Sequence, residues 1–432
     1  MKFIQIFVLL MIAVSLSISS IAEEVDTIPQ LEERIRQKTR LTDLVEYAVL
    51  VNSDIKAVKN EWEASLERQH VVIGYPDPQV SLTYLPDLPN DSPQPKKIEI
   101  MVSQRIPAPG MLSAAGKLNQ SDSYLRQLDV NLKTRDLGIQ IAESYYELFY
   151  LREAQKILAK NKELTIQLKA SAEADYARNQ QALTDVIRLR SQIHQIEYDI
   201  QRFKERENVE SIRLNSLLNR SIQAPFGISE ELSMVPIVFQ LEELIDMAEI
   251  KTIELQMITV EIERSKTESE FARLENKPEY MLGIIFESSL VDAAEGERET
   301  MWGLQFGMTL PIWQDKKAGR VKSTDLLIEK NRHRFHNRLF EIKNTIKETF
   351  FVLKDAERLT ILQRDQVIPE IKHSVETANL WYQQRMKTQM QALELQMLLQ
   401  DSSLVLARAK ADFFKALKKL EGIVGTSLTS KK

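Results

Sequence analysis

The chain has 432 residues and a formal net charge of −5, so it lacks the basic surface that nucleic acid as the main partner would require. It contains no cysteine, which excludes disulfides, thiolate zinc sites, cysteine nucleophiles, iron–sulfur clusters and a lipid anchor attached through an N-terminal cysteine. With only 12 glycines and 14 prolines, and with 28% charged residues, the composition indicates long helices rather than a disordered chain.

The first residues have the pattern of an export signal. Lys2 precedes a mostly apolar run over residues 3–18, interrupted by polar residues such as Gln5 and Ser15. Ser20 and Ala22 are small residues at the −3 and −1 positions of a cleavage site. We expect a signal peptide over residues 1–22, cut after Ala22, with a retained membrane anchor as the alternative. After Ala22 no stretch approaches 18 consecutive apolar residues, so any crossing of a membrane by the mature chain would require β-strands in a closed barrel.

The rest of the chain is an internal duplication. Residues 41–48 (LTDLVEYA) align with 241–248 (LEELIDMA) at an offset of 200, which drifts only to 206 further along. The ordered series continues through Pro78 with Pro278, residues 145–148 with 350–353, and Tyr176 with Tyr382. We therefore predict two repeats, over 23–218 and 241–424, joined by a linker over 219–240 and followed by a tail over 425–432.

Each repeat shows the periodicity of one helix, two strands and a long helical hairpin. The first helices are expected at about 42–72 and 241–274. Alternating apolar residues predict strands at 78–86 and 97–106, and at 279–288 and 300–310. Stretches almost free of proline and glycine predict antiparallel coiled-coil hairpins over 111–218 and 316–422.

The strands have a length that suits a bilayer. Each is about 9–11 residues long, which spans a membrane when the strand is tilted. Aromatic residues occupy strand positions at Tyr84, Tyr280 and Trp302. Four strands cannot close a barrel, since small barrels need about eight, so a membrane assignment implies that several copies share one barrel. The alternative is a small soluble β-domain with one buried face.

These features together resemble the TolC family of outer-membrane efflux channels over about residues 41–425. The resemblance rests on the duplicated halves, on the opening Leu-x-x-Leu-x-x-x-Ala helix with Asn52–Ile55, and on the Pro76–Pro78 step into the first strand. Residues 104–110 (QRIPAPG) resemble the entry into the long helix in the heavy-metal branch of the family, the CzcC- and CusC-like proteins.

The resemblance implies a fold, a location and partners. The fold is mainly α with membrane β: a homotrimer with a 12-stranded β-barrel in the outer membrane, on a 12-helix α-barrel tunnel that projects into the periplasm. The implied function is the passive duct of a tripartite efflux system, with heavy-metal cations as the favoured cargo. Its partners are a periplasmic membrane-fusion adaptor, an inner-membrane pump (RND-type) and outer-membrane lipid, with no role for nucleic acid.

Site residues follow from the same resemblance. The hairpin tips that meet the adaptor correspond to Tyr176 and Tyr382, and the family's tip glycines are replaced here by Asn179 and Arg385, so the tip turn differs. The acidic residues of the periplasmic gate correspond to Asp185, with Arg188 one turn on, and to Gln391 and Glu394 in the second repeat. A ring of Glu394 from three copies would attract and gate cations. The alternative is a solvated helix face.

Other motifs favour structural interpretations. Residues 110–117 fail as a phosphate loop because five residues, not four, separate the glycines and Leu118 stands where Ser or Thr is required. His333 and His336 share a helix face but have no third ligand nearby, and Met386, Met390 and Met397 suit coiled-coil packing as well as soft-metal contact. We expect no enzyme activity, no cofactor and no resident metal site.

Two further functions stay open from the sequence. One is a duct of the same fold that exports drugs, other small molecules or proteins. The other, of a different class, is a periplasmic coiled-coil adaptor or scaffold, which would normally have one hairpin rather than two.

Overall fold

The computed structural model describes residues 28–86, 96–177, 183–230, 232–234, 239–290, 300–383 and 389–428. The predicted cleavage after Ala22 and the tip residues Asn179 and Arg385 lie outside these ranges. The chain divides into two compact units, and each takes segments from both repeats. The first unit draws on Met1–Ala57, Asn131–Thr252 and Phe340–Lys432, and the second on Val58–Val130 and Ile253–Leu339.

The second unit contains one four-stranded antiparallel sheet. Its strands are β2 (Gln79–Leu85), β3 (Lys96–Ile106), β5 (Tyr280–Leu290) and β6 (Thr300–Met308), in the order β2-β3-β5-β6. The central pair, β3 with β5, joins the two repeats along the full length of both strands. The sheet is therefore shared between the repeats rather than formed within either one.

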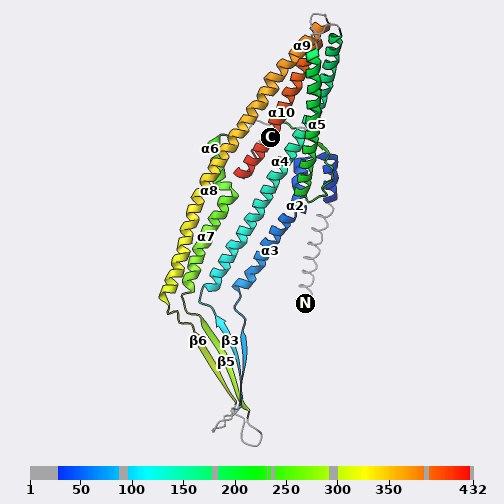
Figure 1. Ribbon diagram of the computed structural model, residues 1–432. Coiled ribbons are helices and arrows are strands. Elements are labelled where there is room, and N and C mark those ends of the chain that lie inside the picture. Colours follow the sequence, from blue (N-terminus) through cyan, green and yellow to red (C-terminus); the bar gives the residue numbers. More distant parts are fainter. Residues whose placement is uncertain are drawn as a thin grey trace, which may run out of the picture. The chain divides into compact units, whose positions relative to one another are not determined.

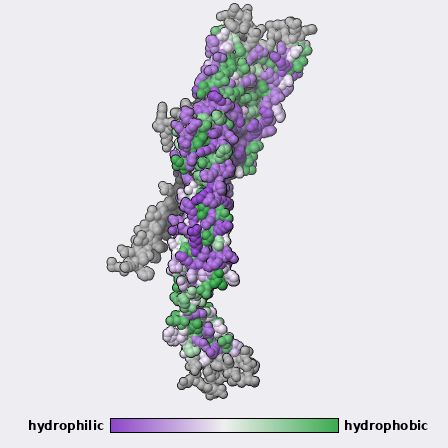
Figure 2. All heavy atoms as spheres, turned by 90° about the vertical axis from the view of Figure 1, so that its left-hand side faces the viewer, coloured by the Kyte–Doolittle hydropathy of each residue, from purple (hydrophilic) through white to green (hydrophobic). Residues whose placement is uncertain are grey.

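The two faces of this sheet differ in chemistry. On one face the register aligns complete rows of apolar residues across all four strands, and these side chains are 38–78% exposed: Val80, Val102, Ile284 and Leu304, then Leu82, Ile100, Phe286 and Trp302. On the other face the aligned rows mix polar and apolar residues: Ser81, Met101, Ile285 and Gly303, then Thr83, Glu99, Glu287 and Met301. Lys97 pairs with Glu287 at 2.7 Å. Figure 2 shows hydrophobic side chains gathered over the strands.

Four helical segments continue from the strands in the second unit. They belong to α3 (Ser53–Ile73), α4 (Met111–Tyr176), α7 (Ile253–Leu274) and α8 (Gln314–Leu362), which lie side by side in that order (Figure 1). Hydrogen-bonded contacts hold α3 to α4 through Ser65 and Asn119, α4 to α7 through Asp122 and Arg264, and α7 to α8 at Ser269 and Asp325.

A tight turn connects the sheet to the first long helix. Gly110 adopts a φ of +91°, and the Met111 amide donates to the Ala108 carbonyl at 3.0 Å. A positive φ is easy for glycine because it has no Cβ. The Gly110–Lys117 segment therefore forms a turn and the first residues of α4, as the structural interpretation of the sequence predicts.

In the first unit, helices pack around a hydrophobic core that includes the first helices of the first repeat. Besides the remainders of α4 and α8, it contains a helix over residues 28–37, α2 (Leu41–Val51), α5 (Leu183–Leu217), α6 (Leu241–Lys251), α9 (Ile368–Gln383) and α10 (Gln389–Val424). Fully buried side chains form its largest cluster, including Leu31, Ile35, Leu44, Ile141, Leu148 and Leu214. A short parallel pair of β1 (Lys38–Thr39) and β4 (Ile228–Ser229) ties the linker between the repeats to this core.

Each predicted opening helix is divided into two helices. The break falls at Asn52 and at Thr252, which have extended ψ angles of 125°. Asn52 Oδ1 accepts hydrogen bonds from the Asp54 and Ile55 amides, as an N-cap of α3, and its Nδ2 donates to the Leu217 carbonyl. Thr252 Oγ1 donates to the Ile423 carbonyl. The uninterrupted helices expected at 42–72 and 241–274 were thus wrong, because helical periodicity continues through a residue that caps a new helix.

The second long helix contains one irregular turn. After α8 ends at Leu362, a π-helical turn covers Gln363–Val367 before α9 begins. Pro369 has no amide hydrogen, and its ring would crowd the carbonyl of Asp365 in a regular helix. The wider turn, closed by the Ile368 amide on the Gln363 carbonyl, accommodates the proline without ending the helix.

None of the helices in the described ranges is both long enough and apolar enough to cross a membrane.

Candidate functional site

The coiled-coil hairpins of the first unit converge on a small apolar core. Leu164, Leu168 and Ala172 of α4 pack against Leu189 of α5 and against Leu393 and Met397 of α10, all at most 8% exposed. On α4 these residues recur every four positions, which places them on one helix face. The core fixes the start of α5 and the start of α10 relative to the end of α4.

Three of the four predicted gate residues meet beside this core. Arg188 of α5 lies between two carboxylates, with its Nη2 at 3.7 Å from Asp185 Oδ1 and at 3.6 Å from Glu394 Oε1 of α10. Leu189 and Leu393, their neighbours in sequence, are buried in the core, so the charged side chains are directed outward. One guanidinium therefore links the first repeat to the second and leaves one unbalanced negative charge.

These ion pairs are exposed and long. The side chains of Arg188, Asp185 and Glu394 are 61%, 38% and 51% exposed. Exposed pairs of this kind contribute about 0–1 kcal/mol, because solvent screens them and ordering the side chains costs entropy. The arrangement suits a contact that forms and breaks rather than a permanent clamp.

The remaining predicted site residues are only partly described. Gln391 lies in the first turn of α10, Tyr176 is the last residue of α4, and Tyr382 lies near the end of α9. The structure describes the backbone of these three residues. Their roles therefore stay predictions.

The structure also contains a buried polar contact between α4 and α10 that the sequence pattern did not predict. Asn161 of α4 is 5% exposed, and its Nδ2 donates to Asp401 Oδ1 of α10 at 3.1 Å. Burial raises the pKa of the Asp401 carboxyl, although the hydrogen bond from Asn161 opposes the rise. Single buried polar residues of this type fix the register of packed helices.

A second missed feature is a charge cluster around Glu147 of α4. Its carboxylate contacts Arg206 of α5 at 3.1 Å, Arg408 of α10 at 3.1 Å, and Lys415 of α10. Burial alone would raise the pKa of Glu147, but the hydrogen bond from Lys415 and the three positive charges hold it below its ordinary value. The sequence did contain a signal for this cluster. Glu147 is an acid in an otherwise apolar and aromatic segment, and the equivalent residue of the second repeat is Val352.

The residues considered for metal binding do not form a cluster of ligands in the described part of the chain. Within the described ranges no three His, Asp or Glu side chains are grouped so that they could hold a metal ion. His333 and His336 are exposed on α8, and His336 packs edge-on against Phe335 at a ring distance of 6.0 Å.

Comparison with known proteins gives matches only at the level of structure. No protein-family model matches the chain, and no curated protein matches it. Solved structures do match. CusC has a TM-score of 0.73 and 12% identity, over 91% of this chain and 93% of that one. VceC, an outer-membrane protein of Vibrio cholerae, has a TM-score of 0.70 and 13% identity, over 90% and 96% of the two chains.

The CmeC outer-membrane channel of Campylobacter jejuni matches with a TM-score of 0.69 and 12% identity, over 90% of this chain and 87% of that one. All three likenesses extend over nearly the whole of both chains. At these identities they bear on the fold and not on cargo or site residues. They confirm, at the level of the fold, the resemblance to the TolC family of outer-membrane efflux channels.

Proposed function

We propose that this protein is the outer-membrane duct of a tripartite efflux system. In this proposal it conducts cargo passively from a periplasmic adaptor and an inner-membrane pump to the outside, and it performs no catalysis. The observation that carries the proposal is the sheet, whose apolar face is open to solvent across all four strands. Such a face needs an apolar environment, since exposing it to water costs about 25 cal/mol per Å².

Lipid is the partner that best suits this face. Lipid-facing bands of membrane strands alternate with a polar interior, as the two faces of this sheet do. Exposed aromatic residues lie at both ends of the strands, with Tyr84 and Trp302 at one end and Tyr75 and Trp313 at the other. Aromatic residues at both ends of membrane strands are typical of the two bilayer interfaces.

The edges of the sheet favour an assembly of copies. Within the described sheet, β2 and β6 each have a neighbour on one side only. An open edge would leave unpaired amide and carbonyl groups in the membrane, which is prohibitively costly. Three copies, joined β6 to β2, would give a closed barrel of 12 strands, and α3, α4, α7 and α8 of each would give a 12-helix tunnel. The homotrimer follows from this requirement and from the resemblance.

The proposal also includes a periplasmic gate. We assign Asp185, Arg188 and Glu394 to it, with Gln391 as the amide counterpart in the second repeat. The hairpin tips at Tyr176, Asn179, Tyr382 and Arg385 are assigned to adaptor contact. The support is that Arg188 joins the two hairpins of one copy through weak, exposed ion pairs.

Heavy-metal cations are the favoured cargo. The support is the resemblance of residues 104–110 to the metal branch, together with an excess of carboxylate at the proposed gate. A deletion strain is expected to be sensitive to copper, silver, zinc, cobalt, nickel or cadmium salts. Sensitivity confined to dyes, detergents and antibiotics would instead assign the duct to organic cargo.

Membrane fractionation tests the duct itself. The full-length chain is expected to remain with outer membranes through washes with high salt and alkaline carbonate, and to form channels in planar bilayers. Release by either wash would contradict the proposal and favour a soluble adaptor or scaffold.

A further inference from the structure

Positive charge is concentrated where the chain passes from the sheet into α8. Trp313 directly precedes the helix, and Lys316, Lys317 and Arg320 follow in its first turns. These four residues stand at i, i+3, i+4 and i+7, a spacing that places them on one face of a helix. The Lys317 amide donates to the Trp313 carbonyl at 3.3 Å, so Trp313 lies at the start of this face. We call the four residues the basic stripe.

Two charges of the basic stripe have no acidic partner. Arg320 pairs with Glu275 of α7 at 2.7 Å. Lys316 and Lys317 form no ion pair within the described ranges, and Lys316 is exposed. Positive side chains destabilise the first turns of a helix, because the helix dipole is positive there. The stability of α8 therefore does not account for the two lysines.

The first repeat has no counterpart of the basic stripe. Its passage from strand to long helix begins at Pro107, and that of the second repeat begins at Pro311. Residues 107–116 (PAPGMLSAAG) carry no charge, whereas residues 311–320 (PIWQDKKAGR) carry three basic residues and one acid. Both segments connect the same kinds of element, so the connection itself does not require lysine.

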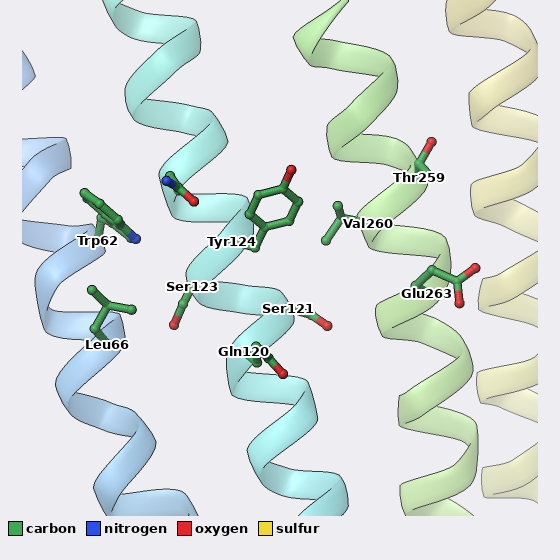
Figure 3. A pocket seen from close by; sticks show the side chains of 10 residues that line it. Trp62, Leu66, Gln120, Ser121, Ser123, Tyr124, Thr259, Val260 and Glu263 are labelled. Carbon is green, nitrogen blue, oxygen red and sulfur yellow. The ribbon is translucent and has the colours of Figure 1, made fainter. Parts of the chain in front are cut away.

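Positive charge is also not a general property of the helices in this unit. Farther from the sheet, α3, α4 and α7 line a hollow of about 510 Å³, with Trp62, Leu66 and Tyr124 among its residues (Figure 3). Its charged residue is an acid, Glu263, which pairs with Lys266 at 2.6 Å. The basic stripe is therefore a local feature of the end of α8 that lies next to the sheet.

The basic stripe follows directly on exposed apolar residues. Leu310, Ile312 and Trp313, between the end of β6 and α8, are 67%, 65% and 72% exposed. In the proposed duct, Trp313 marks the periplasmic interface of the membrane. A rise of 1.5 Å per residue places Lys316 and Lys317 about 4–6 Å farther along the helix. The headgroup layer on each side of a bilayer is about 5–7 Å thick, so both lysines lie at its depth.

We propose that Lys316 and Lys317 bind the phosphate groups of anionic phospholipid headgroups on the periplasmic side of the outer membrane, with Trp313 at the boundary of the acyl chains. The proposal rests on the proposed membrane-spanning duct and names a lipid-binding surface on it. A lysine ammonium is a point charge that suits phosphate, and each lysine near an anionic lipid surface strengthens binding by about fivefold. Arg320 is engaged by Glu275 and is not part of the site.

Titration of lipids into the full-length chain in nonionic detergent tests the site. The probe is dihexanoyl phosphatidylglycerol, followed by isothermal calorimetry, with dihexanoyl phosphatidylcholine and inorganic phosphate titrated in parallel. Phosphatidylglycerol is expected to bind most tightly, because it combines a net negative headgroup with acyl chains that can contact Trp313. Lys316→Gln and Lys317→Gln are each expected to weaken its binding by about fivefold.

Two variants serve as controls. Lys330→Gln removes an exposed lysine of the same helix, about 20 Å farther along, and should leave the binding of phosphatidylglycerol unchanged. Lys317→Arg keeps the positive charge and should bind phosphatidylglycerol as the wild-type protein does. A loss in Lys330→Gln equal to that in Lys316→Gln would mean that total charge, and not this site, determines binding.

The other outcomes separate the site from the proposed duct. Equal dissociation constants for the two lipids, or unchanged binding in both glutamine variants, would overturn the lipid site and leave an acidic protein surface as the partner of the lysines. Inorganic phosphate that binds as tightly as phosphatidylglycerol would overturn it in favour of a free anion. If the site fails while the chain stays in carbonate-washed membranes, the duct stands; release of the chain from the membranes overturns both.

Discussion

Glu147 gathers more opposite charge than any other acid described in the first unit. Arg206, Arg408 and Lys415 all approach its carboxylate, whose side chain is only 13% exposed. Replacing one member of a partly buried group leaves the others uncompensated, which costs more than the net value of the ion pairs.

Glu147→Gln is therefore expected to lower the free energy of unfolding by about 2 kcal/mol. The measurement is the thermal midpoint of the helical circular dichroism of the full chain in detergent. Glu153→Gln is the matched control, because Glu153 forms an exposed pair with Lys156 and should cost less than about 0.5 kcal/mol. Equal losses of unfolding free energy in the two variants would show that the Glu147 cluster stabilises the fold no more than an exposed ion pair does.

The same carboxylate makes stability depend on pH. Its pKa in the folded chain lies below the ordinary value of 4.5, so its contribution is fully present above that pH and is lost as the pH falls further. Wild-type protein should therefore lose stability below about pH 4.5 more steeply than Glu147→Gln. Parallel pH profiles for the two proteins would contradict this assignment.

Arg188 is the residue on which the proposed gate depends. Each copy holds its guanidinium between Asp185 and Glu394, and all three side chains are exposed. Replacing both acids with Ala is expected to raise single-channel conductance in planar bilayers, because the ion pairs that join the hairpins are lost. His194→Ala, farther along α5, is the control and should leave conductance unchanged. Unchanged conductance in the double variant would remove these residues from the gate.

At the scale of elements, the helix breaks at Asn52 and Thr252 link each opening helix to the last turns of the hairpin. Asn52 is 6% exposed and satisfies a backbone carbonyl of the α5 end as well as two amides of α3. Thr252 is 1% exposed, and its hydroxyl donates one hydrogen bond to the Ile423 carbonyl of α10. The two repeats use the same break with different numbers of hydrogen bonds.

We expect Asn52→Ala to cost about 2 kcal/mol of stability and Thr252→Val about 1 kcal/mol, in proportion to the buried hydrogen bonds that are lost. Thermal midpoints of the two variants give the comparison. A larger loss for Thr252→Val would mean that packing rather than capping determines the breaks.

At the scale of the whole molecule, the sheet is the feature on which the proposed membrane location rests. Leu304 lies on the apolar face and is 78% exposed, whereas its neighbour Gln305 lies on the other face. A charge on a lipid-facing strand costs about 2–4 kcal/mol at the bilayer midplane, while a charge on the opposite face is tolerated.

Leu304→Arg is accordingly expected to reduce the amount of protein in carbonate-washed outer membranes, and Gln305→Arg is expected to leave it unchanged. Quantitative immunoblotting of the washed membranes measures both. Equal amounts of the two variants would mean that the apolar face does not meet lipid.

Local periodicity was sufficient to predict the strands and the long helices of this protein from its sequence. Period-two alternation identified four strands whose observed bounds, such as Lys96–Ile106 for the predicted 97–106, differ by no more than three residues. Long runs with almost no proline or glycine likewise indicated α4 and α5, because helix and strand formation depend on residues a few positions apart. The same reasoning could not locate the breaks at Asn52 and Thr252, since an amphipathic pattern runs through both.

What the sequence determined by itself was therefore the duplication, the order of the elements and the alternation of the strands, all of which are readable along the chain. Only the tertiary structure decided which strands pair across the repeats, that Arg188 lies between Asp185 and Glu394, and that Glu147 gathers three basic residues from α5 and α10. The physical reason is that these contacts join residues up to 268 positions apart. Their partners are selected by packing and charge in three dimensions, which a periodic pattern does not record.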